Sequence, residues 1–316
     1  MNAGTPYATL TPDRVLDAIA AAGLHPDGRL LALNSYENRV YQVGLDGGAF
    51  VVAKFYRPQR WSDAAIAEEH AFARELADAE LPLIAPLVFA DRTLLQHDGF
   101  RYAIYPRRGG RAPELESREH LEWTGRLIAR MHGVGAREPF MHRGAIDREA
   151  FIAAPARAVL ASRLLPERQH DKYRQAIVRV DTAVAARFDA VGAVVRLRLH
   201  GDCHPGNLLW TDAGPHFVDL DDARMGPAVQ DLWMLANDEA SLDALLEGYG
   251  QFRDFDPKER ALIPALRAMR QVHWAGWIAQ RWHDPAFPTA FPFAAEPSWW
   301  ERHVDDLNEA TGILED

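Results

Sequence analysis

The first hundred residues alternate apolar and polar positions over short runs that end at turn signals, a pattern typical of β-strands. Asp46-Gly47-Gly48 predicts the turn of an antiparallel hairpin, and Asp98-Gly99 predicts a second turn. The pattern predicts strands at residues 30–34, 37–43, 49–56, 82–90, 93–100 and 101–106. Two helices are expected in the same part of the chain, at residues 11–23 and 63–79.

Beyond residue 111 the apolar period lengthens from two to about 3.6 residues, which indicates helices. A helix at 118–132 is expected to end at Gly133 and to bury one face, formed by Leu121, Leu127, Ile128 and Met131. The Pro-rich segment 284–293 is expected to be non-helical. Further helices are predicted at 156–190, 241–249, 258–282 and 297–313, and short strands at 194–201 and 216–222.

This layout predicts an α+β protein with two lobes. A β-rich N-lobe with one internal helix would cover residues 1–104, followed by a glycine-containing hinge at 105–111. A mainly helical C-lobe would cover residues 112–316. We find no internal repeat and no low-complexity segment, so this two-part division is the main organisation that the sequence predicts.

Composition narrows the function classes. The formal net charge of −10 argues against a protein that binds duplex nucleic acid, and more weakly against docking on anionic lipid. The N-terminus lacks the basic and apolar regions of a secretory signal, and no apolar run reaches the roughly 18 residues of a membrane helix. The single Cys rules out an internal disulfide. We expect a cytoplasmic protein and, without coiled-coil heptads, a monomer.

Residues 199–210, LHGDCHPGNLLW, gather several reactive side chains between apolar ends. A zinc site could use His200, Cys203 and His204, but Pro205 and the preceding strand keep them off one helical face, and no second Cys exists. A thiol nucleophile at Cys203 would need a base and an orienting group, which proximity in sequence does not establish. A turn rich in capping residues is the structural alternative.

A fourth interpretation of residues 199–210 also accounts for a polar residue outside this segment, Asp219. Asp202 and Asn207 lie five residues apart, and Asp219 follows twelve residues later. Protein kinases use this order: an Asp that accepts a hydroxyl proton, an Asn five residues on, and a later Asp, the last two binding Mg²⁺. Oxygen ligands suit Mg²⁺, and the turn at residues 212–214 would bring the oxygens to one edge. We predict Asp202 as catalytic and Asn207 and Asp219 as metal ligands.

The N-lobe pattern supplies an independent check. Lys54 lies within the predicted hairpin strand FVVAKFY, where a kinase needs a cation for the α- and β-phosphates of ATP. Glu69 shares a predicted helix face with apolar residues and therefore needs a partner, for which Lys54 is the first choice. The alternatives are that Lys54 is a solvated edge residue and that Glu69 pairs with Arg74 or water.

The turn expected to cover the phosphates is unusual. It reads LNSYENRV and contains no glycine, whereas protein kinases carry a Gly-rich loop here. Backbone N–H groups of residues 34–37 and the Ser35 hydroxyl could still contact phosphate oxygens. We therefore predict Ser35 as a nucleotide contact.

The motifs HGDCHPGNLLW and FVDLDD, with the Lys54–Glu69 pair, resemble the aminoglycoside phosphotransferase and choline kinase superfamily. Its members have the protein-kinase fold and usually carry HGD in place of HRD. Within it, LNSYENRVYQV, VAKFYRPQRW, LRAMR and DPAFP are most similar to bacterial stress-response protein kinases. The resembling segments spread from residue 33 to 288, so they cover most of the chain.

This resemblance implies an ATP- and Mg²⁺-dependent Ser/Thr protein kinase that phosphorylates itself and other proteins during stress. It implies that Asp202 accepts the proton and that Asp219 is an active-site residue as well as a metal ligand. The implied nucleotide-binding residues are Ser35, Lys54, Glu69, Ala103 and Tyr105. The chain lacks an A-P-E segment and a long activation loop, so peptides cannot be held as in ordinary protein kinases.

Several polar residues around these motifs have open roles. Asp221 is expected either in a second layer of the metal site or as a turn acid, and Asp231 as a support of the catalytic loop or a helix cap. His200 and His204 are expected to brace the loop. Cys203 is expected to be a buried filler, with a redox switch as the alternative.

Two alternatives to a protein kinase are consistent with parts of the sequence. The first is a small-molecule kinase that acts on an amino alcohol such as choline, ethanolamine or homoserine, or on an aminoglycoside. A cage of aromatic residues could bind such a cation, although these residues are more often core: Trp274, Trp277, Trp282, Trp299 and Trp300. The second is a pseudokinase, which the intact set of polar motif residues argues against.

Overall fold

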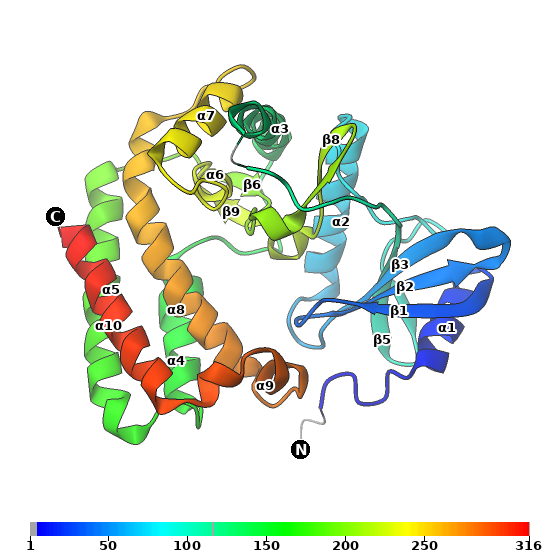
Figure 1. Cartoon of the computed structure of the whole chain (residues 1–316), viewed down its shortest axis with the longest axis horizontal. Helices are drawn as coiled ribbons and strands as arrows, with labels where there is room; N and C mark the ends of the chain where they lie inside the picture. The colour runs from blue at the N-terminus through cyan, green and yellow to red at the C-terminus, as the bar shows by residue number, and fades with distance from the viewer. Residues whose placement is uncertain (1–4, 116, 316) are drawn as a thin grey trace.

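The computed structural model describes residues 5–115 and 117–315. The chain forms two lobes, with a β-sheet at one end of the molecule and a helical body at the other (Figure 1). Helix α2 (Asp63–Asp78) lies between the sheet and the helical body. The two-lobed α+β fold expected from the sequence is confirmed. In the described residues, no helix is both long and apolar enough to cross a membrane.

The N-lobe is built on a five-stranded antiparallel sheet in the order β1-β2-β3-β5-β4. The strands β2 and β3 form the predicted hairpin, in which Gly47 and Gly48 adopt positive φ. Val40 pairs with Lys54, which in turn pairs with Ala103, so Lys54 lies on the central strand. The strand bounds are β1 (Pro26–Leu33), β2 (Arg39–Leu45), β3 (Phe50–Phe55), β4 (Leu95–His97) and β5 (Phe100–Pro106).

The C-lobe combines helices with two small antiparallel sheets, β6-β9 and β7-β8. In the described residues, the one further α-helix of the N-lobe besides α2 is α1 (Pro12–Ala21), whose first turn is capped by Thr11. The C-lobe strands are β6 (Leu197–Leu199), β7 (Leu208–Thr211), β8 (Gly214–Phe217) and β9 (Arg224–Gly226). The C-lobe helices are α3 (Arg118–Gly135), α4 (Ala154–Ala161), α5 (His170–Val191), α6 (Gln230–Trp233), α7 (Glu239–Tyr249), α8 (Ile263–Arg281), α9 (Ala286–Ala290) and α10 (Pro297–Glu315).

Several sequence predictions about elements were wrong. Residues 82–90 form only isolated bridges because Pro82 and Pro86 lack the N–H donors that a strand needs. Helix α3 continues through Gly133 to Gly135. The helix predicted at 156–190 is interrupted at residues 162–169, around Pro166, and the Pro-rich segment does contain the short helix α9. In α9 Pro288 falls within the first turn, where its missing N–H costs no intrahelical bond.

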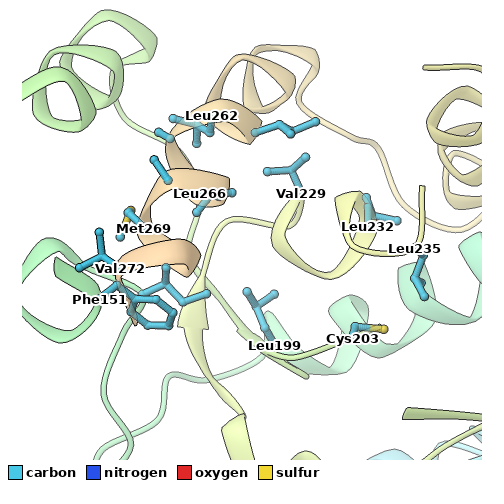
Figure 2. Packing of buried hydrophobic residues seen from close by; sticks show 14 of the residues in the cluster. Phe151, Leu199, Cys203, Val229, Leu232, Leu235, Leu262, Leu266, Met269 and Val272 are labelled. Atoms are coloured by element: carbon cyan, nitrogen blue, oxygen red, sulfur yellow. The ribbon is translucent and has the colours of Figure 1, made fainter. Parts of the chain in front are cut away.

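Three clusters of buried hydrophobic residues form the core of the described residues, and the smallest contains Tyr56, Ile66, Ala103 and Tyr105. The N-lobe cluster packs Val15 and Ile19 of α1 against strand residues such as Phe55. The largest cluster includes Leu199 at the end of β6 and Met269 of α8 (Figure 2), and it extends into the N-lobe through Phe72 and Leu76 of α2. Leu199 directly precedes the polar HGD loop, so the core fixes the point from which that loop leaves its strand.

Helices α3 and α7 approach each other through two glycines. A Cβ atom at Gly125 of α3 would lie 2.0 Å from the backbone oxygen of Leu245, and one at Gly248 would lie 2.0 Å from that of Glu122. Gly133, also in α3, has no atom within 4 Å of such a Cβ atom. The two helices therefore pack backbone to backbone only at the first two glycines.

We predict that Gly125→Ala lowers the free energy of unfolding by about 1–3 kcal/mol, because the added methyl group forces the helices apart. The matched control Gly133→Ala should raise it by roughly 0.5–1 kcal/mol, because the new Cβ meets open space and the residue is helical. Urea denaturation of both variants measures the difference. Equal effects at the two positions would contradict the close α3–α7 contact.

Candidate active site

A cavity of about 860 Å³ lies between the lobes. The sheet contributes residues of β2 and β3, and the C-lobe contributes the HGD loop and one face of α8. Seven of the eight predicted site residues line this cavity: Ser35, Lys54, Glu69, Tyr105, Asp202, Asn207 and Asp219. Ala103 is the exception and is fully buried.

Asp231 holds the loop that carries the catalytic candidates. Its carboxylate accepts hydrogen bonds from the backbone N–H groups of His200 (2.8 Å) and Gly201 (2.9 Å), and it contacts His132 at 3.1 Å. Gly201 has φ +84°, and a Cβ atom there would lie 2.1 Å from the backbone oxygen of Asp222. Asp231 and Gly201 therefore fix the turn, and the expectation that Asp231 supports the loop is consistent with these contacts.

Asp202 projects from this turn into the cavity. Arg270 of α8 donates to its Oδ1 at 2.6 Å, and Nε2 of His204 lies 3.4 Å from Oδ2. Burial alone would raise the pKa of the Asp202 carboxyl, but the contacts with His204 and Arg270 lower it below its usual value. Asp202 therefore stays ionised near neutral pH, as a residue that accepts a hydrogen bond from a hydroxyl must be.

Asn207 and Asp219 present oxygen atoms near the same loop. Nδ2 of Asn207 donates to the backbone oxygen of Asp202 at 2.9 Å, which leaves the amide oxygen available to a ligand. The predicted strand 216–222 was wrong in part: β8 ends at Phe217, and Asp219 adopts the left-handed conformation with φ 62°. This break turns the Asp219 side chain, which is 51% exposed, into the cavity.

Lys54 makes its ion pairs with the C-lobe. Its Nζ lies 2.7 Å from Asp219 Oδ1 and 3.3 Å from Asp221 Oδ1. Burial would lower the pKa of Lys54, but these two carboxylates raise it well above its usual value. Lys54 is therefore a buried cation that spans the lobes, rather than a solvated edge residue.

Glu69 lies at the inward position that the helix pattern predicts and is 2% exposed. In the described residues, the ring of His70 lies 3.9 Å from the Glu69 carboxyl, but burial lowers the pKa of His70 to about 3 and leaves the ring neutral, and neither Lys54 nor Arg74 forms an ion pair with Glu69. Burial raises the pKa of Glu69 to about 7, against the opposing charges of Lys54 and Arg143. The expected Lys54–Glu69 ion pair is therefore absent from this arrangement, although both side chains line one cavity.

Asp221 connects the lobes a second time. This buried carboxylate accepts hydrogen bonds from Arg60 and, at 3.0 Å, from Asn38, and it also faces Lys54. Burial would raise its pKa, but Arg60 and Lys54 lower it to about 2. Asp219 and Asp221 both follow the end of β8, and both reach the same lysine.

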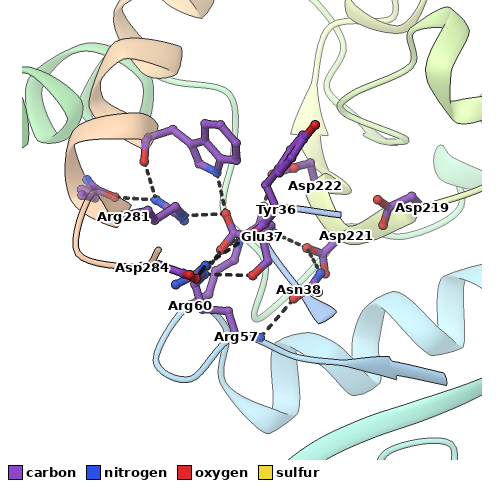
Figure 3. A network of polar contacts seen from close by, with 12 residues as sticks. Tyr36, Glu37, Asn38, Arg57, Arg60, Asp219, Asp221, Asp222, Arg281 and Asp284 are labelled. Carbon is purple, nitrogen blue, oxygen red and sulfur yellow. Dashed lines mark hydrogen bonds and ion pairs between the residues drawn. The ribbon is translucent and has the colours of Figure 1, made fainter. Parts of the chain in front are cut away.

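The loop between β1 and β2 is tied to the C-lobe by Glu37 (Figure 3). The Glu37 carboxylate forms ion pairs with Arg57 (2.8 Å) and Arg281 of α8 (2.6 Å), and it accepts a hydrogen bond from the indole of Trp277. Ser35 precedes Glu37 in this loop and lines the cavity. A loop without glycine is thus held in place by charge.

The far side of the cavity is apolar. Val40 and Val52 of the sheet face it from the N-lobe, and Leu209 faces it from the C-lobe. Tyr105 lines it at the end of β5, and its hydroxyl contacts that of Tyr56 at 3.0 Å. The backbone between Ala103 and Pro106 pairs with β3, so the fully buried Ala103 side chain contributes to the sheet rather than to the cavity wall.

The donor set fits a hard cation. In the described residues, no group of three or more His, Cys, Asp and Glu side chains is placed to hold a metal ion. Asp219 and Asn207 would supply two oxygens, and Mg²⁺ ordinarily takes its remaining ligands from phosphates and water. No second Cys accompanies Cys203, which argues further against zinc.

The remaining candidates of the opening motif make contacts within their own loop or are buried in the core. Nε2 of His200 lies 2.9 Å from the backbone oxygen of Val218, and Nδ1 of His204 accepts from the N–H of Gly206 at 3.0 Å. Cys203 is 1% exposed, and burial raises its pKa well above the usual value, so its thiol is protonated and packed in the core (Figure 2). These environments favour bracing and filling over catalysis or redox switching.

The aromatic residues of the C-terminal helices divide between core and cavity. Trp300 is fully buried. Trp274 and Trp277 line the cavity together with Phe291. Sequence reasoning did not find Arg270, Arg60 or the Glu37–Arg281 pair, because each joins segments more than 60 residues apart and no local motif marks such pairs.

We predict that Glu69 makes stability depend on pH. Its folded-state pKa of about 7 lies above its unfolded value of about 4.3, so the unfolded chain releases the proton first. The contribution of the Glu69 carboxyl to the free energy of unfolding is fully present below about pH 4 and is lost as the pH rises towards 7. Relative to Glu69→Gln, the wild-type free energy of unfolding should fall by roughly 3 kcal/mol over this window.

Urea denaturation at several pH values measures this difference. Subtracting the Glu69→Gln curve removes the titration of all other groups that the two proteins share. A difference that stays constant between pH 4 and 7 would show that Glu69 ionises normally.

Comparisons with known proteins find relatives over most of the chain. The model of the family described as "Phosphotransferase enzyme family" matches residues 29–263. Stress response kinase A of Escherichia coli (strain K12) is 42% identical over 320 residues, covering all of this chain and 97% of that protein. The serine/threonine protein kinase RdoA of Salmonella typhimurium (strain LT2) is 43% identical over 313 residues, covering 98% of this chain and 94% of that protein.

Solved structures share the fold at low sequence identity. An amicoumacin kinase in complex with AMP-PNP, Ca²⁺ and its ligand superposes with a TM-score of 0.71 and 18% identity, covering 93% of each chain. A microcompartment-associated aminopropanol kinase superposes with a TM-score of 0.68 and 18% identity, covering 93% of this chain and 98% of that one. The chain therefore belongs to the phosphotransferase enzyme family, with stress response kinase A among its relatives.

Proposed function

We propose that this protein is an ATP- and Mg²⁺-dependent Ser/Thr protein kinase that phosphorylates itself and other proteins in a stress response. The observation that carries the proposal is the convergence of Asp202, Asn207, Asp219 and Lys54 on one cavity between two lobes. The names of the relatives, stress response kinase A and serine/threonine protein kinase, support a protein acceptor.

The proposed chemistry assigns one task to each polar group. Asp202 orients the acceptor hydroxyl and takes its proton, while Lys54 contacts the α- and β-phosphates. The acceptor oxygen bonds to the γ-phosphorus as the bond from that phosphorus to the bridging oxygen breaks, and ADP leaves with the bridging oxygen. Asn207 and Asp219 would hold Mg²⁺, which neutralises the charge on the phosphates when bound.

The apolar part of the cavity suits the adenine ring. Val40 and Val52 would cover one face of the ring and Leu209 the other, while the backbone from Ala103 to Pro106 would hydrogen-bond its edge. We place the nucleotide-covering lobe at residues 1–104, the hinge at 105–111 and the catalytic lobe at 112–316. We also propose a cytoplasmic monomer.

A small-molecule acceptor is the competing proposal. The aminopropanol kinase and the amicoumacin kinase share the fold at 18% identity, which is a likeness of fold alone. Trp274 and Trp277 face the cavity, and aromatic rings can bind cationic amines. Choline, ethanolamine, homoserine and an aminoglycoside are therefore the acceptors to test against protein.

We predict that the protein labels itself and myelin basic protein when it is incubated with radiolabelled ATP and Mg²⁺. Asp202→Ala should reduce the labelling about a hundredfold or more, because the group that orients the hydroxyl is lost. Asp212→Ala, an exposed acid in the turn after β7, is the matched control and should label normally. ATP consumed only after an amino alcohol or aminoglycoside is added would replace the protein acceptor by a small molecule.

We also predict that Glu37→Gln raises the KM for ATP roughly three- to tenfold, because the phosphate-covering loop loses its ion pairs with Arg57 and Arg281. The value of kcat should change less, since the catalytic loop is untouched. Asp46→Asn, at the exposed opposite end of β2, is the control. An unchanged KM in steady-state kinetics of the Gln variant would mean that the tether does not position the loop.

A further inference from the structure

The wall of the cavity beside Asp202 carries positive charge. Helix α8 has 19 residues and none is acidic, although the chain has 45 acidic and 35 basic residues. One face of α8 lines the cavity with Arg270, His273, Trp274, Trp277, Gln280 and Arg281. The neighbouring wall residues from Ala150 to Pro155 are uncharged.

The carboxylates near this wall are already neutralised. Asp222 faces Arg60 at 2.7 Å and Arg224 at 2.9 Å. Glu37 is likewise held between Arg57 and Arg281 (Figure 3). Among the described residues, the carboxylates near α8 thus leave no unpaired anion for the amine of an amino alcohol or an aminoglycoside.

Arg270 is different from the other arginines of this wall. In the described part of the chain, its only hydrogen bond or ion pair is with Asp202, through one nitrogen, and its side chain is 39% exposed. A guanidinium has five N–H donors in a planar fork, so most of its donors face the cavity unused. Arg270 also covers Oδ1, one of the two oxygens that an acceptor hydroxyl could approach.

Resting on the proposed protein kinase activity, we infer that Arg270 selects an acceptor Ser or Thr that has a carboxylate side chain close by in the peptide. The acceptor's carboxylate binds the free donors of Arg270 and draws the guanidinium away from Asp202. The Asp202 oxygen then accepts the hydrogen bond of the hydroxyl. Recognition of the anion and exposure of the proton acceptor are thereby a single event.

The physical reason is competition between two carboxylates for one arginine. A bidentate pair with a carboxylate has better geometry than the single-nitrogen contact that Arg270 makes with Asp202. A neutral or basic peptide offers no such partner, so Arg270 stays on Asp202 and the hydroxyl finds that oxygen occupied. A basic neighbour would in addition be repelled by the exposed guanidinium of Arg270.

The test uses the full-length protein, radiolabelled ATP and peptides with one Ser in an Ala/Gly background. Asp, Ala or Lys is placed at each flanking position in turn. For the best position, the wild-type kcat/KM should favour Asp over Lys by about tenfold or more. Arg270→Glu should invert this ratio and Arg270→Gln should bring it close to one, whatever their absolute rates.

Arg267→Gln is the matched control, because Arg267 is an exposed arginine one turn earlier on α8 and does not line the cavity. It should keep the wild-type ratio. Thermal melting of each variant checks that it is folded, and choline and ethanolamine serve as amine acceptors in parallel.

The outcomes separate this inference from the proposed function. Peptides labelled without preference for Asp, or with the same preference in Arg270→Glu, would overturn the role of Arg270 and leave the protein kinase standing. Labelling of choline or ethanolamine with no peptide labelled would overturn both. Inversion of the ratio in Arg270→Glu alone, with the wild-type ratio in Arg267→Gln, is the expected result.

Discussion

The buried carboxylate of Asp221 is the constraint on which the arrangement of the lobes depends. An ionised group with 3% exposure must be compensated, and here Arg60, Lys54 and Asn38 of the N-lobe do so together. If the lobes separated, these charges would lose their partners. The same requirement places Lys54 beside Asp219 and closes the cavity in which the proposed chemistry takes place. Charge pairing thus acts together with the apolar contact that Phe72 and Leu76 of α2 make with the C-lobe core to set the position of the sheet over the catalytic loop.

The loop that covers the phosphates follows the same logic. Gly-rich loops approach phosphates closely because their backbone is unhindered. The sequence from Asn34 to Asn38 lacks glycine, so its position must be imposed from outside. Glu37 does this through Arg57 in its own lobe and Arg281 in the other. The arrangement exchanges the adaptability of a glycine loop for a fixed geometry that depends on contact with α8.

The sequence predicted the parts of this site that lie in local motifs. Asp202 and Asn207 occupy one turn, Lys54 lies on a recognisable hairpin strand, and Glu69 follows from helical periodicity, so spacing alone placed all four in the cavity. Prediction from the sequence failed where the local pattern and the tertiary contacts disagree. The apolar run at 82–90 has the composition of a strand but lacks the donors. The ion pair between Lys54 and Asp219 depends on the left-handed backbone conformation of Asp219, which the presence of an Asp residue does not predict. Arg270 reaches Asp202 across 68 residues.

Besides Asp219, the carboxyl groups of Asp221 and Glu69 act on Lys54, and their different pKa values have a consequence for ligand binding. Asp221 has a lowered pKa and stays ionised, whereas burial raises the pKa of Glu69 to about 7. Any ligand that takes the Asp219 carboxylate removes one anion from Lys54. Glu69 lies in the same cavity, and ionisation of its carboxyl would restore the lost charge. With a pKa of about 7, the Glu69 carboxyl is partly protonated near neutral pH, and its ionisation would supply another anion to Lys54. Binding at Asp219 and the proton on Glu69 are coupled through a single lysine.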